Sequence, residues 1–194
     1  MSNIKSSKLV VMGDVSVGKS SVLTKYIKGT FDSFSESTIG AAFFSKHVKG
    51  PNDEDITLEI WDTAGQERYD SLLPMYYRGA QIILFVFDLN NPNTFANLKK
   101  RWFPIIDTCN DNSLFFLVGN KTDLQHNIEE SDIADLLNLY GDIDYYAVSA
   151  KNNIGLEDLF DGIIKKAIER EAFKQNPPIS NLILDKPGRK KCCF

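Results

Sequence analysis

The feature that most constrains the fold is a glycine-rich segment at residues 13–20, GDVSVGKS, with the spacing G-x-x-x-x-G-K-S. A short apolar run, residues 8–12, precedes it, and residues 20–27 show the apolar spacing of a helix. In a strand–loop–helix unit, such glycines let the backbone N–H groups point at phosphate oxygens beside the positive helix end. Lys19 would reach the β- and γ-phosphates, and the Ser20 hydroxyl would bind Mg²⁺. The segment predicts a nucleoside phosphate site, and the alternative is an incidental glycine turn.

Apolar runs and helix-like segments alternate along the rest of the chain. The predicted strands are residues 8–12, 41–48, 56–61, 82–87, 114–118 and 145–148. The predicted helices are residues 20–27, 93–109, 129–140 and 156–168, and Pro104 should kink or split the second of them. Turn residues at 50–55 join two strands as a hairpin. We expect an α/β fold with a six-stranded, mostly parallel sheet, one antiparallel strand, and helices on both faces.

The charge of the chain is unevenly distributed. The 194 residues carry a formal charge of −4, but residues 175–194 carry +3, which leaves −7 on the remainder. An acidic body argues against nucleic-acid binding. We expect one domain at residues 1–174 and a flexible tail at 175–194, where prolines and a glycine replace the periodic pattern. No apolar run approaches the ~18 residues of a membrane-spanning helix, and the N-terminus lacks the apolar stretch of a secretory signal.

Two later segments suit a guanine base. Asn120-Lys121-Thr122-Asp123 follows a buried apolar run, where α/β folds place ligand-binding loops. A carboxylate accepts two hydrogen bonds side by side, which matches the N1–H and exocyclic amine of guanine and no pair on adenine, so Asp123 indicates guanine. Ser149-Ala150-Lys151 follows the last predicted strand and could supply a backbone N–H to the guanine carbonyl. Their order after the phosphate loop carries this interpretation, because the first segment alone has an ordinary loop composition.

Together these segments resemble the small Ras-like GTPases and, among them, the Rab family. The resemblance covers residues 8–173 and includes GDVSVGKS, TIG at 38–40, WDTAGQE at 61–67, NKTD and SAK in order. It implies the P-loop NTPase fold and a monomer that binds GTP or GDP and hydrolyses GTP. The nucleotide-binding residues that it implies are Ser16, Val17, Gly18, Lys19, Ser20, Ser21, Phe31, Thr38, Gly65, Asn120, Lys121, Asp123, Ser149, Ala150 and Lys151. It also implies Mg²⁺ coordination by Ser20, Thr38 and Asp62, and a catalytic Gln66 that orients the attacking water.

The resemblance implies a conformational switch. The γ-phosphate of GTP would tether Thr38 and Gly65 and order residues 31–45 and 64–78, and hydrolysis would release both loops. No arginine in the sequence is obviously placed for the γ-phosphate, so hydrolysis should be slow until an activating protein supplies one. Phe31 would lie edge-on to the guanine, with a core position as the alternative. The plainer alternative for Thr38 is a residue at the entry to a strand.

Val15 departs from the family pattern, because many relatives carry glycine or a small polar residue there. A branched side chain beside the γ-phosphate and Gln66 would crowd the attacking water or an incoming arginine. A hydrolysis-impaired, GTP-bound binding module is therefore an alternative to an active switch. A metabolic P-loop kinase is a third possibility, but it leaves the guanine-binding segments unexplained.

Residues 37–43 and 67–80 look most like those of the early-endosomal and neighbouring endocytic Rab proteins. There, an aromatic trio corresponding to Phe43, Trp61 and Tyr76 forms the apolar patch that effectors bind in the GTP state. The plainer alternative is that these rings belong to the core. The implied partners are an exchange factor, a GTPase-activating protein, a GDP-dissociation inhibitor or escort protein, and effectors. The implied role is vesicle traffic at an endocytic step, with another trafficking step as the alternative.

The basic tail ends in KKCCF, which resembles the Rab signal for double geranylgeranylation on Cys192 and Cys193. Lys191 in the fourth position from the end excludes a CaaX box. Two lipid chains anchor a protein stably where one is marginal, and the lysines would favour an anionic membrane. We expect the chain on the cytoplasmic face of an early endosomal or other endocytic membrane, with a cytosolic pool when GDP is bound.

Overall fold

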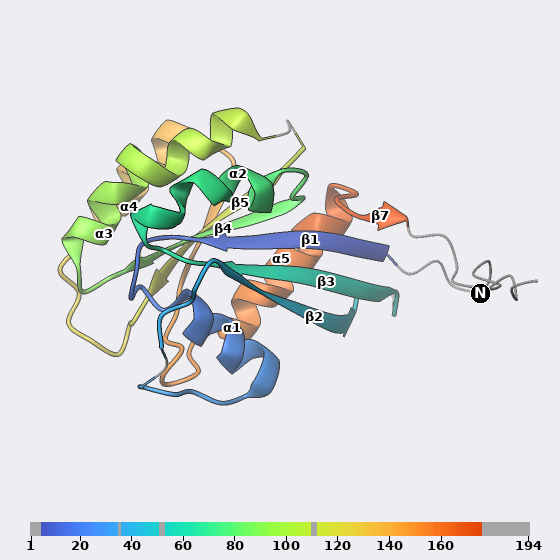
Figure 1. Cartoon of the computed structure of the whole chain (residues 1–194), viewed down its shortest axis with the longest axis horizontal. Coiled ribbons are helices and arrows are strands. Elements are labelled where there is room, and N and C mark those ends of the chain that lie inside the picture. The colour runs from blue at the N-terminus through green and yellow to red at the C-terminus, as the bar shows by residue number, and fades with distance from the viewer. Residues whose placement is uncertain (1–4, 35, 51–52, 110–111, 176–194) are drawn as a thin grey trace, which may run out of the picture.

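The computed structural model describes residues 5–34, 36–50, 53–109 and 112–175, which form one sheet covered by helices (Figure 1). Six strands lie side by side in the order β2-β3-β1-β4-β5-β6. Their bounds are Lys5–Met12 (β1), Ala41–Lys49 (β2), Asp55–Thr63 (β3), Ile82–Asp88 (β4), Leu114–Asn120 (β5) and Ile143–Ala147 (β6). β2 is antiparallel to β3, and the other neighbours in this order are parallel. The predicted six-stranded sheet with one antiparallel strand is confirmed.

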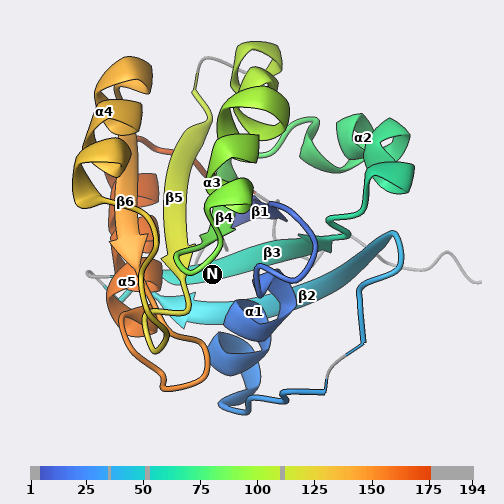
Figure 2. The same cartoon turned by 90° about the vertical axis from the view of Figure 1, so that its left-hand side faces the viewer.

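Helices cover both faces of the sheet, as predicted (Figure 2). They span Lys19–Lys28 (α1), Leu73–Tyr77 (α2), Pro92–Asn97 (α3), Glu130–Tyr140 (α4) and Leu156–Glu169 (α5). Successive side chains of a strand point to opposite faces. Leu9 and Val11 of β1 accordingly pack in the core layer under α1 and α5, whereas Val10 and Met12 pack in the layer under α2, α3 and α4. β4 is buried along its whole length, which explains its uninterrupted apolar sequence.

The helix predicted at residues 93–109 is three helical segments in succession. A π-helical turn, η2 (Leu98–Trp102), follows α3, and a 3₁₀-helix, η3 (Phe103–Thr108), follows that turn. The predicted break at Pro104 is confirmed, because the proline stands in the first turn of η3. The π turn lies before the proline and was not predicted.

Three further elements were not predicted from the sequence, and α2 is one of them. A 3₁₀-helix, η1 (Glu67–Leu72), leads into α2, and a two-residue strand, β7 (Lys174–Gln175), pairs antiparallel with the start of β1. All three elements are too short to show a hydrophobic period. Within the described ranges, no helix has the length and apolar character needed to cross a bilayer.

Candidate nucleotide site

The phosphate loop joins β1 to α1 in a conformation that only glycine allows at two positions. Gly13 has a φ of 146°, and a Cβ there would lie 2.1 Å from the Val86 carbonyl oxygen. Gly18 has a φ of 94°, and a Cβ there would lie 2.3 Å from Nδ2 of Asn120. Ser16 between them also takes a positive φ of 63°. This local backbone explains why the motif needs its glycines.

Lys19 is buried at the start of α1 and curls back over the phosphate loop. Its Nζ donates hydrogen bonds of 2.8 Å to the carbonyl oxygens of Gly13 and of Asp14. Burial lowers the pKa of Lys19 to about 8, although the carboxylates of Asp62 and Asp14 oppose that shift. The ammonium is thus held in place by backbone groups, at the position where phosphate charge would stabilise it.

Three oxygen donors from three different elements meet beside Lys19. The hydroxyl oxygens of Ser20 and Thr38 lie 2.8 Å apart, and the Thr38 hydroxyl donates to Oδ2 of Asp62 over 3.4 Å. Oδ1 of Asp62 is buried and has no hydrogen-bond partner among the described residues. Burial raises the pKa of Asp62, while hydrogen bonds from Ser20 and Thr38 and the charge of Lys19 pull it down. A carboxylate and two hydroxyls fit the hard-oxygen preference of Mg²⁺, and the orphaned oxygen leaves room for one more partner such as a metal-bound water.

The loop after β3 lies directly against the phosphate loop. A Cβ at Gly65 would lie 2.4 Å from the backbone nitrogen of Val15, so the two backbones can approach this closely only because residue 65 is glycine. Gln66 and Val15 both line the cavity between these loops, and the Val15 side chain is 44% exposed. The structure therefore places Val15 beside Gly65 and Gln66, as the sequence interpretation requires.

Asn120 connects three loops at the other end of the cavity. Its Nδ2 donates to the Val17 carbonyl oxygen of the phosphate loop over 2.9 Å. Its Oδ1 accepts from the backbone N–H of Ala150 over 3.2 Å. Since Asn120 ends β5 and Ala150 follows β6, the amide fixes the loops of neighbouring strands to each other.

Asp123 lies next to Asn120 and is supported from the loop after β6. The Ser149 hydroxyl donates to Oδ1 of Asp123 over 2.5 Å, and Nζ of Lys151 lies 4.0 Å from its Oδ2. Lys121 forms an ion pair of 2.7 Å with Asp88 at the end of β4. The carboxylate of Asp123 is thus oriented by neighbours at the mouth of the cavity, where a base would meet it.

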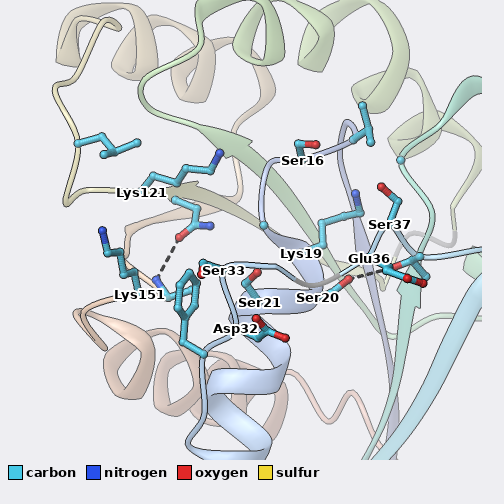
Figure 3. A pocket seen from close by; sticks show the side chains of 18 of the residues that line it. Ser16, Lys19, Ser20, Ser21, Asp32, Ser33, Glu36, Ser37, Lys121 and Lys151 are labelled. Carbon is cyan, nitrogen blue, oxygen red and sulfur yellow. Dashed lines mark hydrogen bonds between the residues drawn. The ribbon is translucent and has the colours of Figure 1, made fainter.

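These groups line one cavity of about 380 Å³ (Figure 3). Most of the predicted nucleotide-binding residues and Gln66 line it. Val17, Ser149 and Asp62 do not: all three are buried behind the wall and act on it through hydrogen bonds or the orphaned oxygen. The lining also contains residues that the sequence interpretation missed, namely Asp32, Ser33, Glu36, Ser37 and Leu124. Leu124 directly follows Asp123. The other four residues lie in the loop between α1 and β2, which carries no motif at these positions and reaches the cavity only through the path of the chain.

The aromatic trio predicted as an effector patch forms one cluster. The ring centroids of Phe43 and Trp61 are 5.2 Å apart, and those of Trp61 and Tyr76 are 5.8 Å apart. Phe43 is 54% exposed, whereas Tyr76 is buried against the sheet. The cluster therefore combines a solvent-facing ring with rings that belong to the core, so the two interpretations of these residues are not exclusive.

A second group of side chains contacts the phosphate loop from behind and escaped the sequence interpretation. Asn97, Arg101 and Trp102 all donate hydrogen bonds to the carboxylate of Asp14. More than eighty residues separate Asp14 from these partners, so no local motif could have indicated the contact. Arg101 is the arginine of this group, but it does not line the cavity.

The fold and the cavity define a P-loop nucleotide-binding protein with a site for a guanine base. The Ras family model matches residues 8–169. "Ras-related protein Rab5A" of Oryza sativa subsp. japonica is 39% identical over 199 residues, which cover 98% of this chain and 96% of the rice protein. "Ras-related protein Rab5" of Nicotiana tabacum is 40% identical with the same coverage, and "Ras-related protein RABF2a" of Arabidopsis thaliana is 42% identical over 88% of this chain and 85% of its own. The chain belongs to the Ras family of small GTPases.

This membership confirms the predicted family, fold and GTPase activity. The chain hydrolyses GTP and is related to Rab5-type proteins. Among the described residues, no group of three or more His, Cys, Asp or Glu side chains could hold a metal ion. The predicted tail begins at Gln175, which lies in β7. The residues from 176 onward, with Cys192 and Cys193, lie outside the described residues.

Proposed function

We propose that this chain is a membrane-anchored Rab-type switch of endocytic, early endosomal vesicle traffic, which recruits effectors while GTP is bound. The Rab5 names of its relatives support the trafficking step. The observation that carries the switch is the hairpin of β2 and β3, because both nucleotide-sensing loops are attached to it. Thr38 lies just before β2, Gly65 lies just after β3, and the backbone N–H of Ala64 donates to the Gly40 carbonyl oxygen over 2.8 Å.

The same hairpin carries two residues of the aromatic trio, and the third, Tyr76, packs on it from α2. Phe43 and Trp61 are direct partners in the β2–β3 register, a few residues beyond Thr38 and before Gly65. A change in the position of either loop therefore acts on the exposed surface through a rigid pair of strands. The aromatic patch would be intact only when both loops are held by the γ-phosphate. Effectors would therefore bind only the GTP form.

Each end of the nucleotide has its own set of residues in this proposal. Lys19 and the phosphate-loop N–H groups bind the β- and γ-phosphates, and Asp123 binds the two guanine donors. Ser20, Thr38 and Asp62 would hold Mg²⁺, which neutralises phosphate charge when bound. Gly65 donates its N–H to the γ-phosphate, and Gln66 orients the attacking water. The side of the guanine ring is covered by Phe31, which lines the cavity.

The regulators follow from this site. Hydrolysis depends on positioning and on stabilising the charge of the transition state, so a GTPase-activating protein accelerates it by adding a cation at the γ-phosphate. An exchange factor opens the Thr38 loop, and a GDP-dissociation inhibitor or escort protein holds the lipidated GDP form in the cytosol. The lipid anchors are geranylgeranyl groups on Cys192 and Cys193, in a tail that follows the domain of residues 1–174.

Imaging a tagged chain in cells tests the proposal. Wild type should label puncta that take up an endocytosed fluorescent tracer within minutes. The Cys192→Ser, Cys193→Ser double variant should be diffuse, and Phe43→Ala should reach membranes without recruiting effectors. Leu139→Ala is the control, because Leu139 is an exposed apolar residue of α4, outside the trio and both nucleotide-sensing loops. Puncta that exclude the tracer would indicate another trafficking step, and unchanged puncta in the double-cysteine variant would refute the lipid anchor.

A second candidate function rests on Val15, which lines the cavity beside Gly65 and Gln66. If its two methyl groups occupy the approach of water, the chain stays in the GTP-bound form and acts as a long-lived binding module. The hydrolysis rate separates this module from the switch.

A further inference from the structure

Arg101 joins the phosphate loop to the loop that follows β3. Its Nη1 donates to the Gly65 carbonyl oxygen over 2.9 Å and lies 3.4 Å from Oδ1 of Asp14. Its Nη2 forms an ion pair with the carboxylate of Asp70 in η1. One guanidinium thus contacts the phosphate loop, Gly65 in the loop after β3, and the short helix η1 that continues this loop.

The π turn of η2 places this arginine. The backbone N–H of Phe103 bonds to the Leu98 carbonyl oxygen, five residues back, which widens the turn. In an α-helix, a residue five positions on is rotated by about 140° away from the first. Here Asn97, Arg101 and Trp102 nevertheless contact one carboxylate, that of Asp14. The wide turn lets positions i, i+4 and i+5 face the same group, and π turns of this kind occur often at functional sites.

Asp14, the residue through which Arg101 contacts the phosphate loop, is held by two further hydrogen bonds. The carboxylate of Asp14 accepts from Nδ2 of Asn97 over 2.6 Å and from Nε1 of Trp102 over 2.8 Å. Trp102 is completely buried, and the Arg101 guanidinium lies over its ring at 4.3 Å from the centroid. The Arg101 side chain is only 23% exposed, and its charge is balanced by Asp14 and Asp70. A planar fork with several donors suits these three acceptors, and a lysine would not reach them all.

We propose that Arg101 is a positioning residue that holds the segment from Gly65 to Asp70 against the phosphate loop in both nucleotide states, and thereby presents Gln66 to the attacking water. The proposal rests on the proposed roles of Gly65 and Gln66. The carbonyl of Gly65 faces Arg101, and in GTP the N–H of the same residue would face the γ-phosphate. In this proposal the Gly65–Arg101 contact is present in both nucleotide states, and the contact of Gly65 with the γ-phosphate is added to it when GTP is bound.

The permanent contact predicts two effects of its loss. Arg101→Gln should raise amide exchange of residues 65–72 in the GDP form by about tenfold, the value of one charge-assisted hydrogen bond. The rise should be smaller with a non-hydrolysable GTP analogue, because the γ-phosphate then holds Gly65 alone. Single-turnover GTP hydrolysis should fall by a similar factor, because Gln66 is less often in position. Arg101→Lys should give intermediate values in both measurements, since it keeps the charge and loses the fork.

The test compares hydrogen exchange and single-turnover hydrolysis of the full chain with those of two further variants. Lys100→Gln removes the same charge from the neighbouring, exposed position of η2 and should match wild type. Asp70→Asn removes only the more exposed partner of Arg101. It should raise amide exchange of residues 67–72 and leave exchange in α3 and η2 unchanged. Equal exchange and hydrolysis in Arg101→Gln and Lys100→Gln would overturn the proposal. So would a wild-type result for Asp70→Asn alongside a general loss of protection in Arg101→Gln, since Arg101 would then serve only folding.

Failure of the switch itself is a separate result. If wild type shows the same exchange with GDP and with the GTP analogue, the proposed function fails, while the GDP-state comparison of Arg101→Gln with Lys100→Gln still decides the role of Arg101.

Discussion

The two ends of the nucleotide cavity are built differently. At the guanine end, Asn120, Ser149 and Ala150 are buried. Asn120 forms hydrogen bonds with Ala150 and with the phosphate loop, and Ser149 forms one with Asp123. At the γ-phosphate end, the loop before β2 lies at the surface, with Phe34 91% and Ile39 78% exposed. The Thr38 hydroxyl, with its bonds to Ser20 and Asp62, links that loop to the cavity wall.

This difference separates recognition from response. A base-binding end held by the core has the same shape with any nucleotide, so it selects guanine without sensing phosphate. A loop held through few side-chain contacts has low local stability and changes position when a phosphate adds or removes one contact. Variants at the guanine end should therefore weaken the binding of GDP and GTP alike, whereas variants at the γ-phosphate end should affect only the GTP form.

The largest effect is expected at the guanine end. Asp123→Asn replaces a double acceptor by a group that presents a donor to guanine, and should weaken GDP binding by about a hundredfold or more. Titration with a fluorescent GDP analogue measures this. The loss should be much smaller for inosine diphosphate, which lacks the exocyclic amine. Asp132→Asn on the exposed side of α4 is the control, and equal affinities for both variants would refute the assignment of Asp123.

Thr38→Ala should instead separate GTP from GDP. Outer-shell partners alone are worth about 10- to 100-fold in metal affinity, so loss of this hydroxyl should cost at least about tenfold for a Mg²⁺–GTP analogue. The affinity for GDP should stay near that of wild type, because in the GDP form the Thr38 loop is already released from the nucleotide. The comparison uses both nucleotides in excess Mg²⁺. Thr30→Ala, at an exposed position in the same connection, is the control, and an equal loss for both nucleotides would contradict a role specific to the γ-phosphate.

Ser149→Ala tests whether the guanine end is part of the core. Its hydroxyl donates to Asp123 and accepts from the backbone N–H of Asn152 over 3.0 Å. Loss of a buried hydrogen bond to a carboxylate should lower the free energy of unfolding by about 1–3 kcal/mol, with a less than tenfold loss of GDP affinity. Chemical denaturation measures the first quantity. Ser113→Ala, whose hydroxyl bonds to the Ala80 carbonyl oxygen, provides the comparison, and a stable Ser149→Ala protein would argue against this coupling.

The smallest expected effect concerns Val15. Val15→Gly removes a side chain beside Gly65 and Gln66, so single-turnover GTP hydrolysis should rise by a few-fold, with a larger rise when an activating protein is present. Val15→Ala should lie between the two. Identical rates for valine and glycine, with and without the activating protein, would eliminate the long-lived binding module as a function.

The motifs at the guanine end and the phosphate loop could be predicted because each lies within a few consecutive residues. The glycines of residues 13–18 and the segment from Asn120 to Asp123 follow strands whose apolar runs are visible in the sequence. The hairpin of β2 and β3 was also predictable from its turn residues at 50–55.

The γ-phosphate end shows why the rest could not be predicted. η1 and α2 are no more than two turns long and lie in a segment interrupted by Pro74, so no hydrophobic period reveals them. The π turn at Leu98 comes from the way Asn97, Arg101 and Trp102 meet Asp14, and that contact joins distant parts of the chain. Pro104 marks a break but not the geometry that precedes it. Tertiary contacts therefore decided those elements in which local propensity is weak.

The short strand β7 fixes where residue 175 lies relative to the nucleotide cavity. It pairs with Lys5 and Ser6 at the start of β1, whereas the phosphate loop begins at the end of that strand, about 25 Å away at the rise of a β-strand. Gln175, the last described residue, therefore lies at the end of the sheet opposite the cavity (Figure 1). With the proposed lipids on Cys192 and Cys193, the sixteen intervening residues span at most ~60 Å. The aromatic trio and both nucleotide-sensing loops can thus face the cytosol, with their surfaces clear of the bilayer.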